Sequence, residues 1–260
     1  MKLLFWRKSP KKRKHVHLPD FIGFEHDIVP LRKRKYNQDG LATTHSNDFA
    51  FEPRFEKAYD AAFATGSWSG THIHWRAHVI CWAAAAASNL EGDFVECGTD
   101  RGGTAMLVLV YLQEKILNRQ FLLFDTFRGL DKSVSSTKEI ERSREAYPDC
   151  YEEVVLRFKS YQNIKIVRGV IPMSLEGQIP NKIAYLHIDL NSANVERTAI
   201  EALWPSIVDG GIVVLDDYNW TARADQKKSM DEFARMQGIH ILSLPTGQGL
   251  MIKMNSKDVL

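Results

Sequence analysis

The sequence predicts an α/β fold built on a doubly wound, mostly parallel sheet with an antiparallel strand at its end. Short apolar runs alternate with helical patterns from residue 91 onward, as in parallel strands joined by right-handed crossovers. The last two apolar segments instead flank the short turn TGQG, which predicts a hairpin. This hairpin places an antiparallel strand beside the parallel ones.

Five apolar runs are the predicted parallel strands. They are DFVECG (93–98), FLLFD (121–125), IKIVRG (164–169), KIAYLHIDL (182–190) and IVVLDDY (212–218). The helical patterns between and after them are TAMLVLVYLQEKI (104–116), YEEVVLRF (151–158), NVERTAIEALWPSI (194–207) and MDEFARMQG (230–238). The closing hairpin is predicted to pair IHILSLP (239–245) with LMIKM (250–254). Gly210 and Gly211 are expected between the third of these helices and the fifth strand.

Residues 49–90 are predicted to form two helices ahead of the sheet, and these helices serve as a lid or cover. The first is an amphipathic helix that ends before Gly66, with Pro53 in its first turn and aromatic residues four apart at Phe51, Phe55, Tyr59 and Phe63. The second begins after Thr71, a candidate N-cap, and ends near Asn89. The sheet domain itself is predicted over residues 91–256.

Residues 1–48 are predicted to be a basic, poorly ordered arm without strand or helix. Residues 1–35 hold 11 Lys and Arg against three acidic residues, which leaves 23 basic against 29 acidic residues in the rest of the chain. We expect a solvated leader, and the alternative is a contact with an anionic membrane surface, nucleic acid or an acidic partner. Self-association into a homo-oligomer stays open.

The composition indicates a protein of the cytoplasm. At 260 residues and 44% hydrophobic content, the chain can bury one substantial core. No apolar stretch approaches the roughly 20 residues of a membrane span, and the opening MKLLFW lacks the features of a secretory signal. The three cysteines, Cys81, Cys97 and Cys150, lack metal-site spacing and suit unreactive thiols in a reducing compartment.

A glycine-rich loop after the first strand of the sheet is the predicted cofactor site. Its residues Glu96, Gly98, Gly102 and Gly103 would let a ligand approach the backbone at a helix N-terminus. The spacing E-x-G-x-x-x-G departs from the dinucleotide pattern G-x-G-x-x-G and disfavours a nicotinamide dehydrogenase. Asp125 ends the adjacent strand, where it could accept both hydroxyls of an adenosine ribose; the alternative is that it only caps the turn DTFRG.

Three aspartates at the ends of two further strands are the predicted metal site. Asp189 follows one strand, and Asp216 and Asp217 end the next. Carboxylates this close would repel one another unless a cation neutralised them, and oxygen ligands suit Mg²⁺. The metal would lower the pKa of an acceptor hydroxyl. The alternative is that one aspartate of the pair faces solvent or caps a loop.

The segments GDFVECGTDRGG, FDTFRGL and HIDLN…SIVDGGIVVLDDY resemble the macrocin O-methyltransferase (TylF/MycF-like) family of S-adenosylmethionine enzymes. The resemblance covers roughly residues 66–254. It implies a seven-stranded Rossmann-like sheet, methyl transfer to hydroxyls of small acceptors such as sugars, and a divalent metal on the matching acids. It also implies that Glu96 to Gly103 hold the methionine part, Asp125 the ribose, and Thr71 the cofactor carboxylate.

The chain departs from this family at the general base. The family carries a catalytic histidine in the insertion after the second strand, yet residues 126–186 contain no histidine. Asp189 is the candidate for this role, and His187 lies on the same strand face by period-two alternation. Tyr218 and Trp220 are expected either to wall the acceptor pocket or to pack the loop.

These features predict an S-adenosylmethionine-dependent O-methyltransferase, metal-assisted and acting on a small hydroxylated acceptor. One alternative is a methyltransferase of RNA or protein that uses the basic arm as a tether, although nucleic acid is not the expected partner. The other is a protein that binds the cofactor without turnover, because the insertion histidine is missing.

Overall fold

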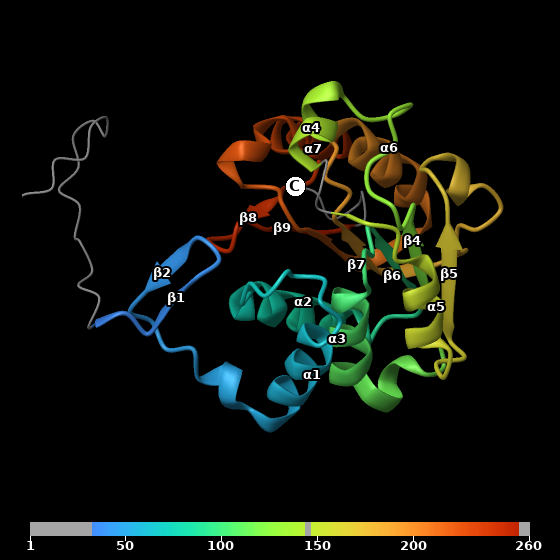
Figure 1. Ribbon diagram of the computed structural model, residues 1–260. Helices are drawn as coiled ribbons and strands as arrows, with labels where there is room; N and C mark the ends of the chain where they lie inside the picture. The colour runs from blue at the N-terminus through green and yellow to red at the C-terminus, as the bar shows by residue number, and fades with distance from the viewer. Residues whose placement is uncertain (1–32, 144–146, 255–260) are drawn as a thin grey trace, which may run out of the picture.

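A seven-stranded sheet forms the centre of the computed structural model, which describes residues 33–143 and 147–254 (Figure 1). Its strand order is β5-β4-β3-β6-β7-β9-β8. The strands are β3 (Asp93–Cys97), β4 (Phe121–Asp125), β5 (Ile164–Arg168), β6 (Ile183–Ile188), β7 (Ile207–Leu215), β8 (Leu242–Ser243) and β9 (Gly249–Ile252). Strands β3 to β7 pair in parallel, whereas β9 runs antiparallel to both β7 and β8. The predicted fold class is confirmed.

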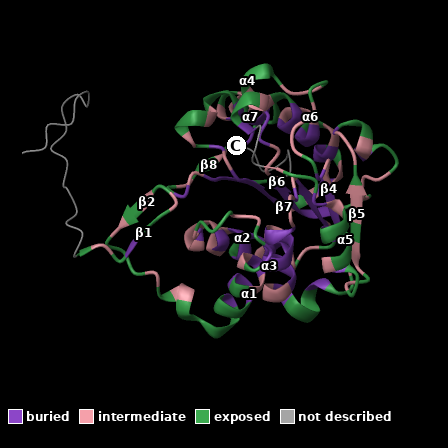
Figure 2. Cartoon of the chain, in the orientation of Figure 1, coloured by how far each residue is buried: buried purple, intermediate pink, exposed green. Residues whose placement is uncertain are grey.

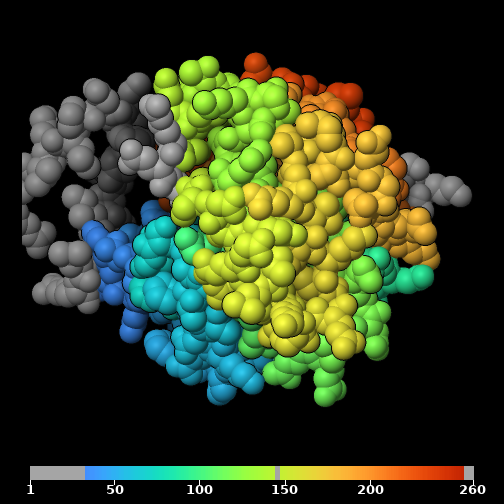
Figure 3. Space-filling view, turned by 45° about the vertical axis from the view of Figure 1, so that its right-hand side comes forward, coloured from blue at the N-terminus to red at the C-terminus, as the bar shows by residue number. Residues whose placement is uncertain are grey.

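Helices cover both faces of the sheet (Figures 1 and 2). One apolar core lies between the sheet and α1, α2, α3 and α5, and a second lies between the sheet and α6 and α7. The α-helices are α1 (Pro53–Phe63), α2 (His74–Ala87), α3 (Gly103–Leu112), α4 (Thr137–Ser143), α5 (Tyr151–Phe158), α6 (Ala193–Leu203) and α7 (Ala224–Gln237). Short 3-10 helices are η2 (Asp48–Phe51), η3 (Gln113–Ile116), η4 (Met173–Leu175), η5 (Trp204–Ser206) and η6 (Thr221–Arg223). Figure 3 shows α5 and β5, in yellow-green and yellow, on the face turned forward.

The central elements are apolar because they are covered on all sides. Strand β6 is buried along its whole length between β3 and β7, as expected for a parallel strand with helices on both faces. Helix α3, GTAMLVLVYL, has almost no polar face because it lies between the sheet and helices α1 and α2. These elements hold the strand ends that form the site.

The prediction of an arm without strands over residues 1–48 is wrong for its last part. Strands β1 (Tyr36–Gln38) and β2 (Leu41–Thr43) form an antiparallel hairpin. Asp39 and Gly40 both have positive φ, 52° and 70°, as the two-residue turn of a hairpin requires. Residues 1–32, which hold 8 of the 11 Lys and Arg of residues 1–35, lie outside the described residues.

Several predicted boundaries are also corrected. Helix α2 begins at His74 after Ile73, so Thr71 is not its N-cap, and the predicted helix over 104–116 changes to 3-10 geometry after Leu112. Strand β7 begins at Ile207, so Gly210 and Gly211 lie inside the strand. Tertiary pairing with β6 and β9 extends this strand through glycines that resemble a turn in isolation.

Two further predictions concern membranes and cysteines. Within residues 33–143 and 147–254, no helix combines the length and the apolarity needed to span a bilayer. Cys81, Cys97 and Cys150 are buried free thiols. Burial raises the pKa of Cys150 to about 12, so this thiol stays protonated at neutral pH.

Candidate functional site

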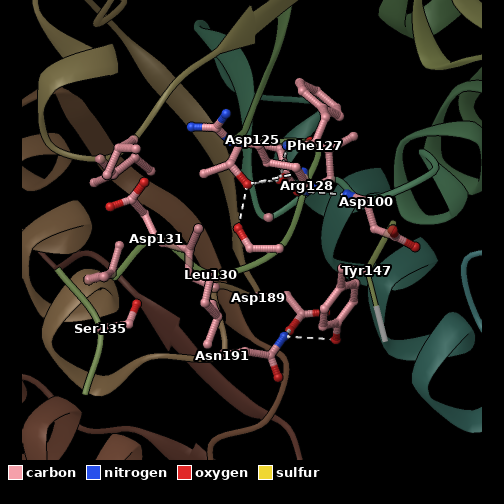
Figure 4. A pocket seen from close by; sticks show the side chains of 18 of the residues that line it. Asp100, Asp125, Phe127, Arg128, Leu130, Asp131, Ser135, Tyr147, Asp189 and Asn191 are labelled. Atoms are coloured by element: carbon pink, nitrogen blue, oxygen red, sulfur yellow. Dashed lines mark hydrogen bonds between the residues drawn. The ribbon is translucent and has the colours of Figure 1, made fainter. Parts of the chain in front are cut away.

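A cavity opens at the carboxyl ends of the parallel strands, where doubly wound sheets bind ligands (Figure 4). It encloses about 930 Å³, counted out to its open mouth. The loops after β3, β4, β5 and β6 line it, together with Ser67 and Trp68 before α2 and Tyr147 from the insertion before α5.

The predicted glycine loop forms one wall of this cavity, with Gly98, Thr99 and Asp100 at its surface. Gly98 has φ +91°, and a Cβ atom there would lie 1.8 Å from the carbonyl oxygen of Asp189, so only glycine fits. This close approach brings the loop after β3 against the end of β6.

Gly102 and Gly103 begin α3 and lie behind the cavity rather than on its surface. Gly102 has φ +84°, and a Cβ atom there would lie 2.5 Å from the ring of Phe158. The Gly103 N–H donates to Ser67 Oγ over 2.9 Å, so Ser67 satisfies one free donor of the helix N-terminus. These two glycines shape the loop through packing.

Asp125 lies on the cavity wall opposite the insertion and organises the glycine loop. Its Oδ2 accepts the N–H groups of Thr99 and Asp100, both over 2.7 Å, and its Oδ1 accepts the N–H of Phe127 over 2.7 Å (Figure 4). The carboxylate therefore caps its own turn, as the alternative expected, and also ties the loops after β3 and β4 together. Asp125 also lines the cavity, and its contact with a ribose stays a prediction.

Glu96 and His187 lie under the cavity, not in it. Glu96 has no exposed surface and His187 is 1% exposed. The Oε2 atom of Glu96 is 3.8 Å from His187 Nδ1, and His187 Nε2 is 3.6 Å from Asp216 Oδ1. Burial, with repulsion from Asp125 and Asp216, raises the pKa of Glu96 well above its ordinary value. Neither side chain lines the cavity.

Thr71, predicted to touch the cofactor, is exposed and does not line the cavity. Ser67 and Trp68, a few residues earlier, lie there instead. The loop between α1 and α2 approaches the cavity through these two residues because Ser67 binds the start of α3.

Another part of the cavity is lined by Asp189, Asn191 and Tyr147 (Figure 4). Asn191 Nδ2 donates to Asp189 Oδ1 over 3.1 Å and lies 3.4 Å from the Tyr147 hydroxyl. Burial, with repulsion from Asp216 and Asp217, raises the pKa of Asp189 well above its ordinary value. Asp189 is thus a half-buried carboxyl that lines the cavity.

Asp216 and Asp217 are held by arginines. Arg76 Nη1 lies 2.5 Å from Asp216 Oδ2 and 3.6 Å from Asp217 Oδ1, and Arg223 Nε lies 3.4 Å from Asp217 Oδ2. Gln248 Nε2 donates to Asp216 Oδ1 over 3.0 Å. Burial alone would raise the pKa of Asp216, but Arg76, His187 and Gln248 together outweigh it and lower this pKa well below its ordinary value.

The predicted Mg²⁺ site over Asp189, Asp216 and Asp217 does not fit this arrangement. Among the described residues, no three His, Cys, Asp or Glu side chains are placed to hold one metal ion. Both oxygens of Asp216 already accept hydrogen bonds from side chains of the protein. Arg76 supplies the positive charge that the sequence analysis assigned to a metal ion.

Tyr218 and Trp220, the aromatic residues after β7, pack the loop, which was one of the two alternatives expected for them. Tyr218 is 4% exposed, and its hydroxyl accepts a hydrogen bond from Lys227 Nζ over 2.7 Å. Trp220 contacts two glycines: Cβ atoms on Gly40 and Gly247 would lie 3.0 and 2.4 Å from its ring.

Sequence reasoning missed Ser67, Arg76 and Tyr147. Arg76 sits inside a helix without a motif, and its partners lie 37 and 140 residues away. Tyr147 belongs to the insertion that lacks the expected histidine, so the insertion itself was the signal for it.

Two known O-methyltransferases are similar to part of this chain. A 4'-O-methyltransferase of a rhamnosyl-tetracenomycin from Streptomyces olivaceus is 24% identical over 149 residues, and demethyldecarbamoylnovobiocin O-methyltransferase from Streptomyces niveus is 25% identical over 149 residues. Each match covers 53% of this chain and 57% of the relative, so the chain spans little more than half the length of these proteins.

The solved structure of the O-methyltransferase NovP shares the fold, with a TM-score of 0.62 and 20% identity over 69% of this chain and 80% of that one. The model of the macrocin-O-methyltransferase (TylF) family matches residues 37–242, which is most of the chain. The chain therefore belongs to the macrocin-O-methyltransferase (TylF) family.

Proposed function

We propose that this protein transfers a methyl group from S-adenosylmethionine to a hydroxyl of a small glycosylated acceptor. The observation that carries the proposal is one cavity that joins the glycine loop and Asp125 at one end to Asp189 at the other. Membership of an O-methyltransferase family supports the reaction, and the two Streptomyces relatives, by their names, support a glycosylated acceptor. We place the reaction in the cytoplasm.

The cofactor would occupy the end of the cavity near β3 and β4. Asp125 would face the ribose, Gly98 to Asp100 would lie along the amino-acid part, and Ser67 would stand beside the start of α3. When bound, S-adenosylmethionine supplies an electrophilic methyl group. The protein residues hold the donor still and exclude water from it.

The acceptor hydroxyl would bind beside Asp189. We assign Asp189 as the residue that takes the hydroxyl proton, while the oxygen forms its bond to the methyl group and the sulfur leaves with its electron pair. Tyr147 and Asn191 would orient the acceptor by hydrogen bonds. His187 lies too deep to touch the acceptor, and we assign it a supporting role under Asp216.

The substitution Asp189→Asn tests this assignment. Methyl transfer from labelled S-adenosylmethionine to a panel of glycosylated acceptors should fall on the order of 10³-fold, because the proton acceptor is lost. Cofactor affinity, measured by calorimetry, should change by less than about threefold, since this side chain lies at the acceptor end. The same substitution at Asp209, exposed on β7, is the matched control and should leave both values unchanged.

Three results would contradict the proposal. Full activity of Asp189→Asn would remove the assigned role of this residue. Tight cofactor binding by the wild type, without transfer to any hydroxyl of the panel, would favour the non-catalytic alternative. Salt-sensitive binding and methylation of RNA would favour the nucleic-acid alternative, which draws on the basic residues 1–32.

A further inference from the structure

Arg76 makes an unusually complete set of ion pairs for an arginine inside a helix. Its Nε and Nη2 donate to the two oxygens of Asp39 over 2.7 and 2.8 Å, a bidentate pair. Its Nη1 donates to Asp216 over 2.5 Å and lies 3.6 Å from Asp217. One guanidinium therefore joins the turn of the β1–β2 hairpin to the two aspartates that end β7.

This arginine is buried with its partners. The side chain of Arg76 is 14% exposed, and those of Asp39, Asp216 and Asp217 are 10 to 16% exposed. Carboxylates this deep need a cation close by, because each is costly to desolvate alone. Arg76 supplies that cation at the position where the sequence pattern alone would place a metal.

The hairpin fixes the guanidinium in this position. Its turn residue Gly40 packs against Trp220, and a Cβ atom there would lie 3.0 Å from the ring. The Cζ atom of Arg76 lies 5.5 Å from the centre of the same ring, in the range of a cation–π contact. Asp39 and Trp220 thus hold Arg76 from two sides, and the arginine is preorganised against Asp216.

We propose that Arg76 is a built-in substitute for the divalent cation that the sequence predicts beside Asp189, next to this cavity. The guanidinium holds Asp216 and Asp217 in place, and the site needs no metal ion. Arg76 is a positioning residue here, because it acts on the site through the two aspartates. The role at the acceptor end rests on the proposed function, but the occupation of the cation position does not.

Metal binding tests this proposal apart from methyl transfer. The full-length protein, loaded with S-adenosylhomocysteine, is titrated with Mn²⁺, and free Mn²⁺ is followed by its electron paramagnetic resonance signal. The wild type should bind Mn²⁺ with a Kd weaker than about 1 mM, the weak end of protein sites for divalent cations. Arg76→Gln should bind one Mn²⁺ at least about tenfold more tightly, because it removes the cation that pairs with Asp216.

Two variants serve as controls: one keeps the positive charge of residue 76, and the other removes an arginine elsewhere. Arg76→Lys keeps a cation on the helix and should bind Mn²⁺ no more tightly than the wild type. Arg197→Gln removes an arginine that pairs with Glu201 on α6, away from the cavity, and should also match the wild type. If Arg76→Gln does not fold, Arg76→Met is the second variant: it also removes the guanidinium from Asp216 and should tighten Mn²⁺ binding severalfold.

The outcomes separate cleanly. A wild type that binds one Mn²⁺ tightly, and loses methyl transfer in chelator, overturns the proposal while leaving the proposed function intact. Failure of both Arg76→Gln and Arg76→Met, when folded, to gain Mn²⁺ binding also overturns it. If Arg76→Gln gains Mn²⁺ binding and the wild type transfers no methyl group, the proposal is supported and the proposed function is defeated.

Discussion

The two ends of the cavity are built from different kinds of contact. At the cofactor end, one carboxylate, Asp125, accepts backbone N–H groups from the loop beside it. At the acceptor end, ion pairs between side chains, above all that of Arg76 with Asp216, connect elements far apart in the chain. Backbone donors are present whatever the neighbouring side chains are, whereas an ion pair exists only when both partners are brought together.

This difference has consequences for stability. The carboxylates at the acceptor end crowd one another, and burial with mutual repulsion raises the pKa of Asp189 and of Asp217. Folding must therefore compensate several negative charges there, and it does so with Arg76 and Arg223. At the cofactor end, backbone N–H dipoles stabilise the Asp125 carboxylate, so it needs no second charged side chain.

The largest effect is expected where the two ends touch. Gly98→Ala would place a Cβ atom 1.8 Å from the carbonyl oxygen of Asp189 at φ +91°. We expect the free energy of unfolding to fall by about 4 kcal/mol, from overpacking together with backbone strain, and cofactor binding to be lost. Urea denaturation measures the first and calorimetry the second.

Gly177→Ala is the matched control for this variant. Gly177 also has positive φ, +66°, but nothing lies within 4 Å of its added Cβ atom. The loss there should be about 1 kcal/mol, the backbone cost alone. Equal losses at the two glycines would show that the contact of Gly98 with Asp189 is unimportant.

The next effect sharpens the electrostatic side of the comparison. Glu196 on α6 is buried beside the acceptor end, where burial and the charge of Asp217 raise its pKa to about 8. The fold favours the protonated form, so its contribution to stability is present below about pH 4.5 and is lost as the pH rises through about 8.

Glu196→Gln should remove this pH dependence, because glutamine stays neutral. The variant should equal the wild type near pH 4 and exceed it by about 3 kcal/mol at pH 7, as measured by urea denaturation at each pH. Glu201→Gln, on the same helix but half-exposed and paired with Arg197, should leave the pH profile unchanged. A constant difference between Glu196→Gln and the wild type from pH 4 to 9 would contradict this account.

The smallest effect tests the cofactor end. Asp125→Asn removes the charge that assists the hydrogen bonds from Thr99 and Asp100. Cofactor affinity by calorimetry should weaken about tenfold, or about 1.4 kcal/mol. The control Asp93→Asn alters a carboxylate that accepts the N–H of Gln120 at the opposite end of β3, and its affinity should stay that of the wild type. An unchanged affinity in Asp125→Asn would remove this residue from the cofactor site.

The sequence was a good guide wherever function depends on neighbours in the chain. Strand β4 was predicted with its observed limits, and Asp125 and Gly98 were expected at the cavity, where they lie. Prediction was poorer for Thr71, because the start of α2 is set by packing, and for Glu96, whose side chain points under the site. Strand periodicity places a side chain on a face but does not say whether that face is open.

The β1–β2 hairpin shows the same limit. Its turn, Asp39 and Gly40, is a strong two-residue hairpin signal, yet the surrounding basic and polar residues resembled an arm. The hairpin rests on contacts with Arg76 and Trp220, which a local pattern does not contain.

The amino-acid sequence by itself determined the order of strands and helices, the glycine loop and the carboxylates at the strand ends, because hydrophobic period and turn chemistry are local properties. Only the tertiary structure decided which cation meets those carboxylates. Arg76 reaches Asp216 across 140 positions of the chain, and such a pair follows from how α2, the hairpin and β7 pack together.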